Sequence, residues 1–170
     1  MLGQITKLIK AFNSDVAPAQ ISLGIAFAMI VGLTPLWSLH NLLVLFLVMI
    51  LRVNGPAFLA GIPLFALLSY LLDPLFHKLG YFLLKLESLN GLWVMMYNST
   101  LWRIENFNNT IVAGSLVFSV VLFVPVYFTG VWVINNYRTR LMAWINKFKL
   151  TRLLKLKGWV DKFNSLIKLK

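Results

Sequence analysis

No charged residue occurs from Asn106 to Tyr137. A helix over residues 110–137 is long enough to cross the roughly 30 Å hydrocarbon core of a bilayer with some tilt. Apolar residues make up 59% of the chain and charged residues only 12%, whereas soluble domains carry about 25% charged residues. A chain of 170 residues cannot enclose so much apolar surface, because small domains have much surface for their volume. We therefore expect an all-α integral membrane protein.

Two shorter apolar stretches, 18–33 and 36–51, come earlier in the chain. Each is predicted to form a helix of about 24 Å, which is short for a full crossing. The pair forms a helical hairpin that either spans the membrane or re-enters from one side. Small residues recur every fourth position in the first helix and predict a face for close helix packing: Gly24, Ala28 and Gly32.

Prolines predict where the helices end or break, because proline lacks a backbone N–H and clashes with the preceding turn. Pro35 lies in the hairpin turn, Pro63 interrupts the third apolar stretch, and Pro74 follows Asp73. The third helix is therefore expected to be kinked or broken.

Five segments are expected along the chain. An amphipathic interfacial helix over 1–13 precedes a membrane domain over 15–86, which holds the hairpin and the broken helix. Residues 87–109 form an external interfacial segment, since they include aromatic residues of the kind enriched at membrane interfaces. The transmembrane helix over 110–137 is followed by a basic amphipathic helix over 138–170.

The basic residues concentrate at the C-terminal end of a chain whose net charge is +11. Because this charge follows an apolar span, it indicates contact with anionic lipid head groups and not with nucleic acid. The distribution of Lys and Arg favours cytoplasmic N- and C-termini. The expected head-group contacts are Arg138, Arg140, Lys147, Lys149, Arg152, Lys155 and Lys157.

Polar residues beside the apolar helices are the candidates for a binding site. Ionisable and polar groups at membrane depth are costly and often functional. Trp37, His40 and Asn41 in the hairpin turn, with Arg52 after the second helix, are predicted to bind a substrate or lipid. Asp73 and His77, four residues apart, are a possible polar pair. The chain has no Cys, and we expect no metal, no cofactor and no catalytic residues.

One stretch resembles a known bacterial family, the domain of unknown function 2062. The resemblance covers roughly residues 15–85 and is carried by the small-residue helix, Pro35 and His40, and the end of the second helix from Leu51 to Ala57. The family typically has an Asn-Pro pair in its third segment, where this chain has Ile62-Pro63. The resemblance implies a bacterial inner-membrane protein and does not imply a reaction.

Three functions remain open from the sequence. The first is a small, non-enzymatic inner-membrane protein that handles or transports a lipid or lipid-linked envelope precursor, as a subunit of a complex. The second is a structural anchor for a larger envelope protein, or a homo-oligomer. The third is a proton- or ion-coupled carrier that uses His40, Asp73 and His77.

Overall fold

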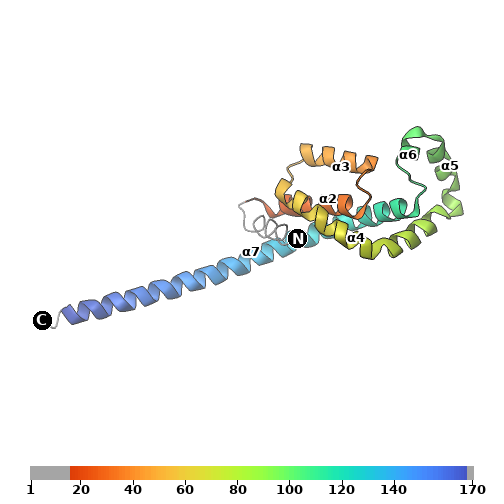
Figure 1. Ribbon diagram of the computed structural model, residues 1–170. Coiled ribbons are helices and arrows are strands. Elements are labelled where there is room, and N and C mark those ends of the chain that lie inside the picture. Colours follow the sequence, from red (N-terminus) through yellow and green to blue (C-terminus); the bar gives the residue numbers. More distant parts are fainter. Residues whose placement is uncertain (1–15, 168–170) are drawn as a thin grey trace. The chain divides into compact units, whose positions relative to one another are not determined.

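The computed structural model describes residues 16–167, with side chains for residues 16–140, and this part of the chain consists of helices joined by turns and loops. The expected all-α class is therefore confirmed for these residues, while the predicted helix over 1–13 lies outside them. The helices, shown in Figure 1, are α2 (Pro18–Leu33), α3 (Leu39–Ile50), α4 (Gly55–Leu84), the 3-10 helix η1 (Glu87–Leu89), α5 (Asn90–Asn98), α6 (Thr100–Ile104) and α7 (Thr110–Ile167).

The chain forms two compact units, Met1–Ile134 and Asn135–Lys170. The first contains α2 to α6 and the beginning of α7. The second contains the remainder of α7, which is helical as far as Ile167. The predicted basic segment 138–170 is therefore helical over most of its length.

Helix α2 is the centre of the first unit. It runs parallel to α4, since Gly24 lies against Asn54 and Gly32 lies against Ile62 and Phe65. It runs antiparallel to α7, since the Ser22 hydroxyl donates a hydrogen bond to the carbonyl oxygen of Tyr127, whereas Phe27, later in α2, packs against Phe123, earlier in α7. Eleven of the 16 residues of α2 are buried, so this helix is enclosed by its neighbours.

Helix α4 is continuous through both of its internal prolines, and the predicted breaks at Pro63 and Pro74 are wrong. Each proline removes one N–H, which leaves the carbonyls of Leu59 and Tyr70 without their usual helical donors. The other backbone hydrogen bonds of α4 are kept, because an unpaired backbone N–H or carbonyl group costs free energy in apolar surroundings. Figure 1 shows the consequence as a bend along an unbroken ribbon.

Two glycines allow α4 and the start of α7 to approach very closely. A Cβ added to Gly80 would lie 1.9 Å from the carbonyl oxygen of Thr110, and one added to Gly114 would lie 1.9 Å from that of Phe76. Only hydrogen fits in both places. Sequence reasoning placed the small-residue face on α2 and missed this second glycine contact.

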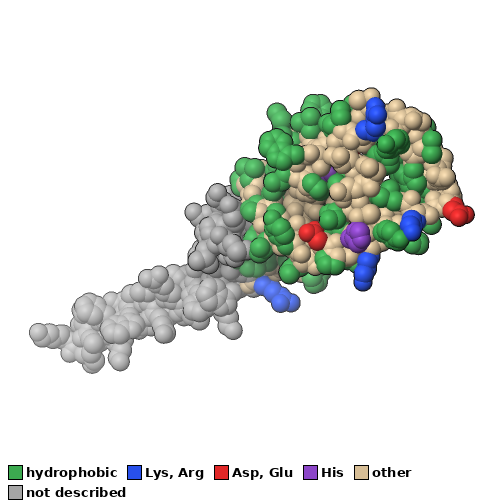
Figure 2. Space-filling model, turned by 45° about the vertical axis from the view of Figure 1, so that its right-hand side comes forward, with side chains coloured by type: hydrophobic (Ala, Val, Ile, Leu, Met, Phe, Trp, Pro, Cys, Tyr) green, Lys and Arg blue, Asp and Glu red, His purple; other side chains and the backbone are tan. Residues whose placement is uncertain are grey.

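Two helices among the described residues are long and apolar enough to cross a membrane, Gly55–Leu84 and Thr110–Arg140. Helix α3 is shorter and leaves much of its apolar surface uncovered, with Met49 78% and Leu42 65% exposed. In Figure 2, apolar side chains cover much of the visible face of the described residues, and charged side chains are scattered singly among them.

Candidate functional site

The turn between α2 and α3 is held by polar side chains on its inner side. Thr34 and Asn41 are both buried, at 5% and 6% exposure. The Asn41 amide donates to the carbonyl oxygens of Pro35 and Leu36, at 2.8 and 3.4 Å. Its side-chain oxygen lies 3.1 Å from the Thr34 hydroxyl, which also lies 2.8 Å from the carbonyl oxygen of Ile30. Asn41 therefore fixes the turn and satisfies its backbone.

Helix α3 begins at Leu39, three residues later than predicted, because its first N–H groups meet the carboxylate of Glu105. The N–H groups of Leu39 and His40 donate to Glu105 Oε2 at 2.6 and 3.3 Å. The preceding Ser38 does not cap the helix, since its hydroxyl donates to the carbonyl oxygen of Pro35 instead. A carboxylate is favourable at this end of a helix, where unpaired N–H groups and the helix dipole present positive charge.

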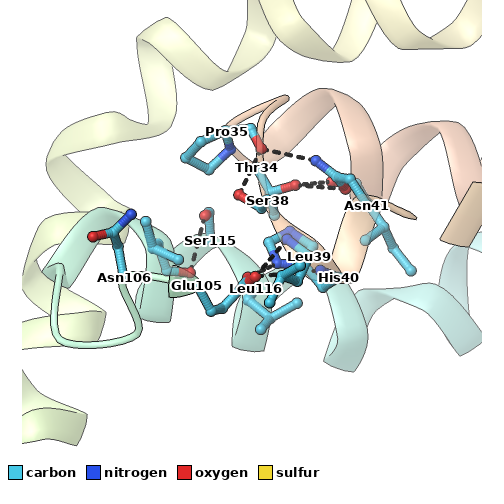
Figure 3. A network of polar contacts seen from close by, with 12 residues as sticks. Thr34, Pro35, Ser38, Leu39, His40, Asn41, Glu105, Asn106, Ser115 and Leu116 are labelled. Carbon is cyan, nitrogen blue, oxygen red and sulfur yellow. Dashed lines mark hydrogen bonds and ion pairs between the residues drawn. The ribbon is translucent and has the colours of Figure 1, made fainter. Parts of the chain in front are cut away.

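The second oxygen of Glu105 contacts the side chain of His40. Oε1 faces His40 Nδ1, as Figure 3 shows. An ionised carboxylate is only an acceptor, so Nδ1 must carry the proton. The other ring nitrogen, Nε2, is buried and has no hydrogen-bond partner within the described chain. Glu105 therefore orients the imidazole and fixes its protonated nitrogen.

Glu105 reaches the hairpin from the loop that follows α6. The chain turns at Asn106, the one non-glycine residue with a positive φ, 55°, among the described residues. Asn is one of the few residue types that adopt this conformation readily. The turn leaves Glu105 only 4% exposed. Burial of a carboxylate is costly unless hydrogen bonds compensate, and the N–H groups of Leu39 and His40 supply them together with the His40 ring.

Two cavities adjoin this network. One of about 540 Å³ lies between α3 and α4; its walls are apolar except at the hairpin turn, where Ser38 and Asn41 line it. The other, of about 310 Å³, is lined by His40 and Glu105 together with apolar residues of α3, α6 and α7. His40 and Glu105 are the only ionisable residues on either wall. The larger cavity is therefore apolar along α3 and α4 and polar at the hairpin turn.

The predicted binding residues are only partly brought together. Trp37, His40 and Asn41 share the turn, where the Trp37 side chain is 99% exposed at the rim of the larger cavity. Arg52 follows the other end of α3, about 18 Å of helix away. Arg52 therefore does not belong to the same site.

Asp73 and His77 do not form the predicted pair in the described structure. His77 Nδ1 lies 2.7 Å from the Thr110 hydroxyl of α7, and no hydrogen bond joins it to Asp73. The start of α7 offers a closer partner than the carboxylate one turn away on the same helix.

The remaining predicted residues are placed as follows. Gly24, Ala28 and Gly32 lie on the side of α2 that faces α4, where the Cβ of Ala28 approaches Gly61. Arg140 is exposed and Arg138 half-buried. The side chains of the other expected head-group contacts lie outside the described residues: Lys147, Lys149, Arg152, Lys155 and Lys157. Across the described residues, no three His, Asp or Glu side chains are grouped so that they could hold a metal ion.

Glu105 is the site residue that sequence reasoning missed. It lies 65 residues from His40, so no local spacing links the two. The one signal in the sequence was that acidic residues are rare. The chain has only five of them, and Glu105 directly precedes the long uncharged stretch.

Comparison with known proteins places this arrangement in a family. A family model described as "Uncharacterized protein conserved in bacteria (DUF2062)" matches residues 5–142. The match extends beyond the predicted region of 15–85 on both sides, so that it includes Glu105 and much of α7. A relative from Treponema pallidum (strain Nichols), named "Uncharacterized protein", is 26% identical over 141 residues, which cover 83% of this chain and 87% of the relative. No solved structure matches.

Proposed function

The chain belongs to the bacterial family DUF2062, and we propose that it is a small inner-membrane protein that handles a lipid or lipid-linked envelope precursor by holding one of its apolar chains between α3 and α4. The observation that carries this proposal is the 540 Å³ cavity, which is apolar along its length and polar at the hairpin turn. Lipids have the same division into an apolar chain and a polar head. The role is non-enzymatic, and the protein acts as a subunit of a larger complex.

The arrangement of charges supports a transmembrane position for the hairpin. Leu33, at the end of α2, packs in one cluster with Leu72 and Phe118, and the first charged residue of α4, Asp73, comes directly after Leu72. At the other end of α2, Ile21 packs with Ala57 and Ile134. These two clusters bound an uncharged layer that is about 18–24 Å thick. This is thinner than the hydrocarbon core of a typical bilayer, but a bilayer can adapt to it by local thinning.

We propose that the Arg52 turn lies on the cytoplasmic side of this layer, following the preference of Lys and Arg for that side. The hairpin turn and the segment from η1 to α6 lie on the outer side. Of the two alternatives for the hairpin, we therefore favour a crossing over re-entry, and the polar end of the cavity opens near the outer leaflet.

Photolabelling tests the proposal. The full chain is reconstituted in vesicles with lipids that carry a diazirine on the acyl chain, irradiated, digested and mapped by mass spectrometry. We expect labels on cavity residues such as Leu42 and Leu59 to exceed those on the exposed face of α7 several-fold, because a held chain stays beside its wall. Equal labelling of the two surfaces would mean that no chain is held.

A matched pair of variants separates the cavity from general contact with lipid. Leu59 lines the cavity and is 66% exposed, whereas Val121 of α7 is 65% exposed and lines neither cavity. Leu59→Trp should fill the slot and remove the preferential labelling. Val121→Trp should leave that labelling intact.

The exposed face of α3 favours a second function, that of a membrane anchor that binds another protein or a second copy. Leu42, Met49 and Ile50 are all more than 60% exposed, and grouped exposed apolar side chains often mark a surface that contacts another protein or a membrane. Because the chain has no native Cys, Met49→Cys gives a clean probe. A disulfide-linked dimer formed in the membrane would support self-association of this face.

A further inference from the structure

Glu105 and the hairpin turn give the polar end of the cavities a definite chemical character. His40 and Glu105, which line the smaller cavity, are the only ionisable residues that line either cavity, and neither wall contains Lys or Arg. Arg103, two residues before Glu105, is exposed and lines neither cavity. The ring nitrogen Nδ1 of His40 lies against the carboxylate of Glu105, so that neither cavity wall offers a cation that is free to pair with a phosphate.

We propose that this site selects lipids with an uncharged, hydroxyl-bearing head group and rejects those with an anionic phosphate head group, and that Glu105 is the residue that sets this preference. The inference rests on the proposed lipid-binding function and narrows its substrate class. A phosphate brought to the turn meets a second negative charge at Glu105 and no Lys or Arg on the cavity walls. Glu105 lines the smaller cavity, and its carboxylate accepts the N–H of Leu39, a residue that lines both cavities. Like charges that come close in surroundings poor in water repel strongly.

The hydrogen-bonding capacity left at the turn points to the same class of ligand. The side-chain donors of Ser38 and Asn41 are used within the turn. Their oxygens keep free lone pairs, since a hydroxyl oxygen and an amide oxygen each accept two hydrogen bonds. Both residues line the larger cavity. A hydroxyl can donate to these oxygens, whereas an ionised phosphate offers only acceptors.

The test compares two lipids that differ only in the head group. Diacylglycerol and phosphatidic acid, with identical diazirine-labelled chains and at equal mole fraction, are incorporated with the full chain into phosphatidylcholine nanodiscs. Only labels on peptides that line the two cavities are counted, which excludes the basic C-terminal segment. The net charge of +11 concentrates phosphatidic acid around the protein and so works against the expected result.

For the native chain we expect diacylglycerol to label the cavity peptides about tenfold more than phosphatidic acid, as one like-charge repulsion implies. Glu105→Gln keeps the shape and the acceptor oxygen but removes the charge, and should bring the ratio to within about twofold. Glu87→Gln is the matched control, because Glu87 belongs to the same external segment, is exposed and lines neither cavity. It changes the net charge equally and should leave the ratio as in the native chain.

Each outcome decides one question. Equal labelling by the two lipids in the native chain, or stronger labelling by phosphatidic acid, overturns the selectivity even if Glu105→Gln does not fold. The same ratio in Glu105→Gln and the native chain removes Glu105 as its cause. Absence of cavity labelling by either lipid overturns the proposed lipid-binding function itself, and the selectivity with it.

Discussion

The carboxylate of Glu105 links two parts of the chain that are distant in sequence. It accepts hydrogen bonds from two N–H groups of α3 and contacts His40 while only 4% exposed. A buried carboxylate of this kind stabilises the fold only while all its hydrogen-bond partners are present. If one partner is removed, the polar groups that stay behind are unpaired in an apolar environment, which costs free energy.

A double-mutant cycle on Glu105 and His40 measures this dependence. Glu105→Ala should lower the free energy of unfolding by about 3 kcal/mol, since it leaves His40 and two N–H groups unpaired. His40→Ala should cost less, because the α3 N–H groups still bind the carboxylate. The two losses should be clearly less than additive in the double variant, by about 1 kcal/mol or more. Strict additivity in unfolding measured in detergent would argue against a direct contact.

The glycine contact between α4 and α7 is the second feature at the residue scale. Gly114→Ala should lower the melting temperature markedly, since its Cβ would overlap the carbonyl oxygen of Phe76 and overpacking of this kind typically costs about 1–3 kcal/mol. A Cβ added to Gly91 of α5 would meet no atom within 4 Å, so Gly91→Ala is the control. Equal melting temperatures for the two variants would contradict the close approach of the helices.

At the scale of elements, α4 has a well-defined beginning. The side-chain oxygen of Asn54 accepts a hydrogen bond from the N–H of Ala57 at 2.8 Å, and the Asn54 N–H donates to the carbonyl oxygen of Gln20 at 3.0 Å. One residue therefore caps α4 and joins it to α2.

Removal of this cap tests how much it contributes. Asn54→Ala should destabilise the protein by about 1 kcal/mol, the usual loss for an N-cap. Asn54→Asp keeps an acceptor oxygen at the helix start and should retain most of the stability. Thermal unfolding followed by circular dichroism distinguishes the two, and an alanine variant as stable as the native chain would show that the cap contributes nothing.

At the scale of the whole molecule, the sequence predicts those parts that depend on local signals. The hairpin was predictable because Pro18, Pro35 and the sequence after Leu51 mark the ends of its helices. The continuity of α4 was not predictable. Sequence rules count the backbone N–H group that each of Pro63 and Pro74 removes, but not the cost of leaving further backbone groups unpaired in apolar surroundings. The family resemblance is confirmed over a longer range than predicted.

The site was predictable only in part, for a related reason. His40 and Asn41 are recognisable as polar residues between apolar helices. Glu105 joins them through the tertiary fold, across 65 positions of the chain. Helix α3 separates Arg52 from the hairpin turn, which the sequence pattern alone did not show. The partner of His77 is Thr110 of α7, on another helix.

The disposition of the hairpin is the premise on which the lipid site and its outer opening both depend, and cysteine labelling in intact cells tests it most directly. Trp37 is the best position, because its side chain is 99% exposed and protection there cannot come from the folded unit itself. Arg52→Cys, also exposed, marks the opposite end of α3. We predict that a membrane-impermeant maleimide modifies Trp37→Cys from outside the inner membrane and modifies Arg52→Cys only after permeabilisation. Protection of Trp37→Cys from both sides, or its modification only from the cytoplasm, would contradict a crossing hairpin.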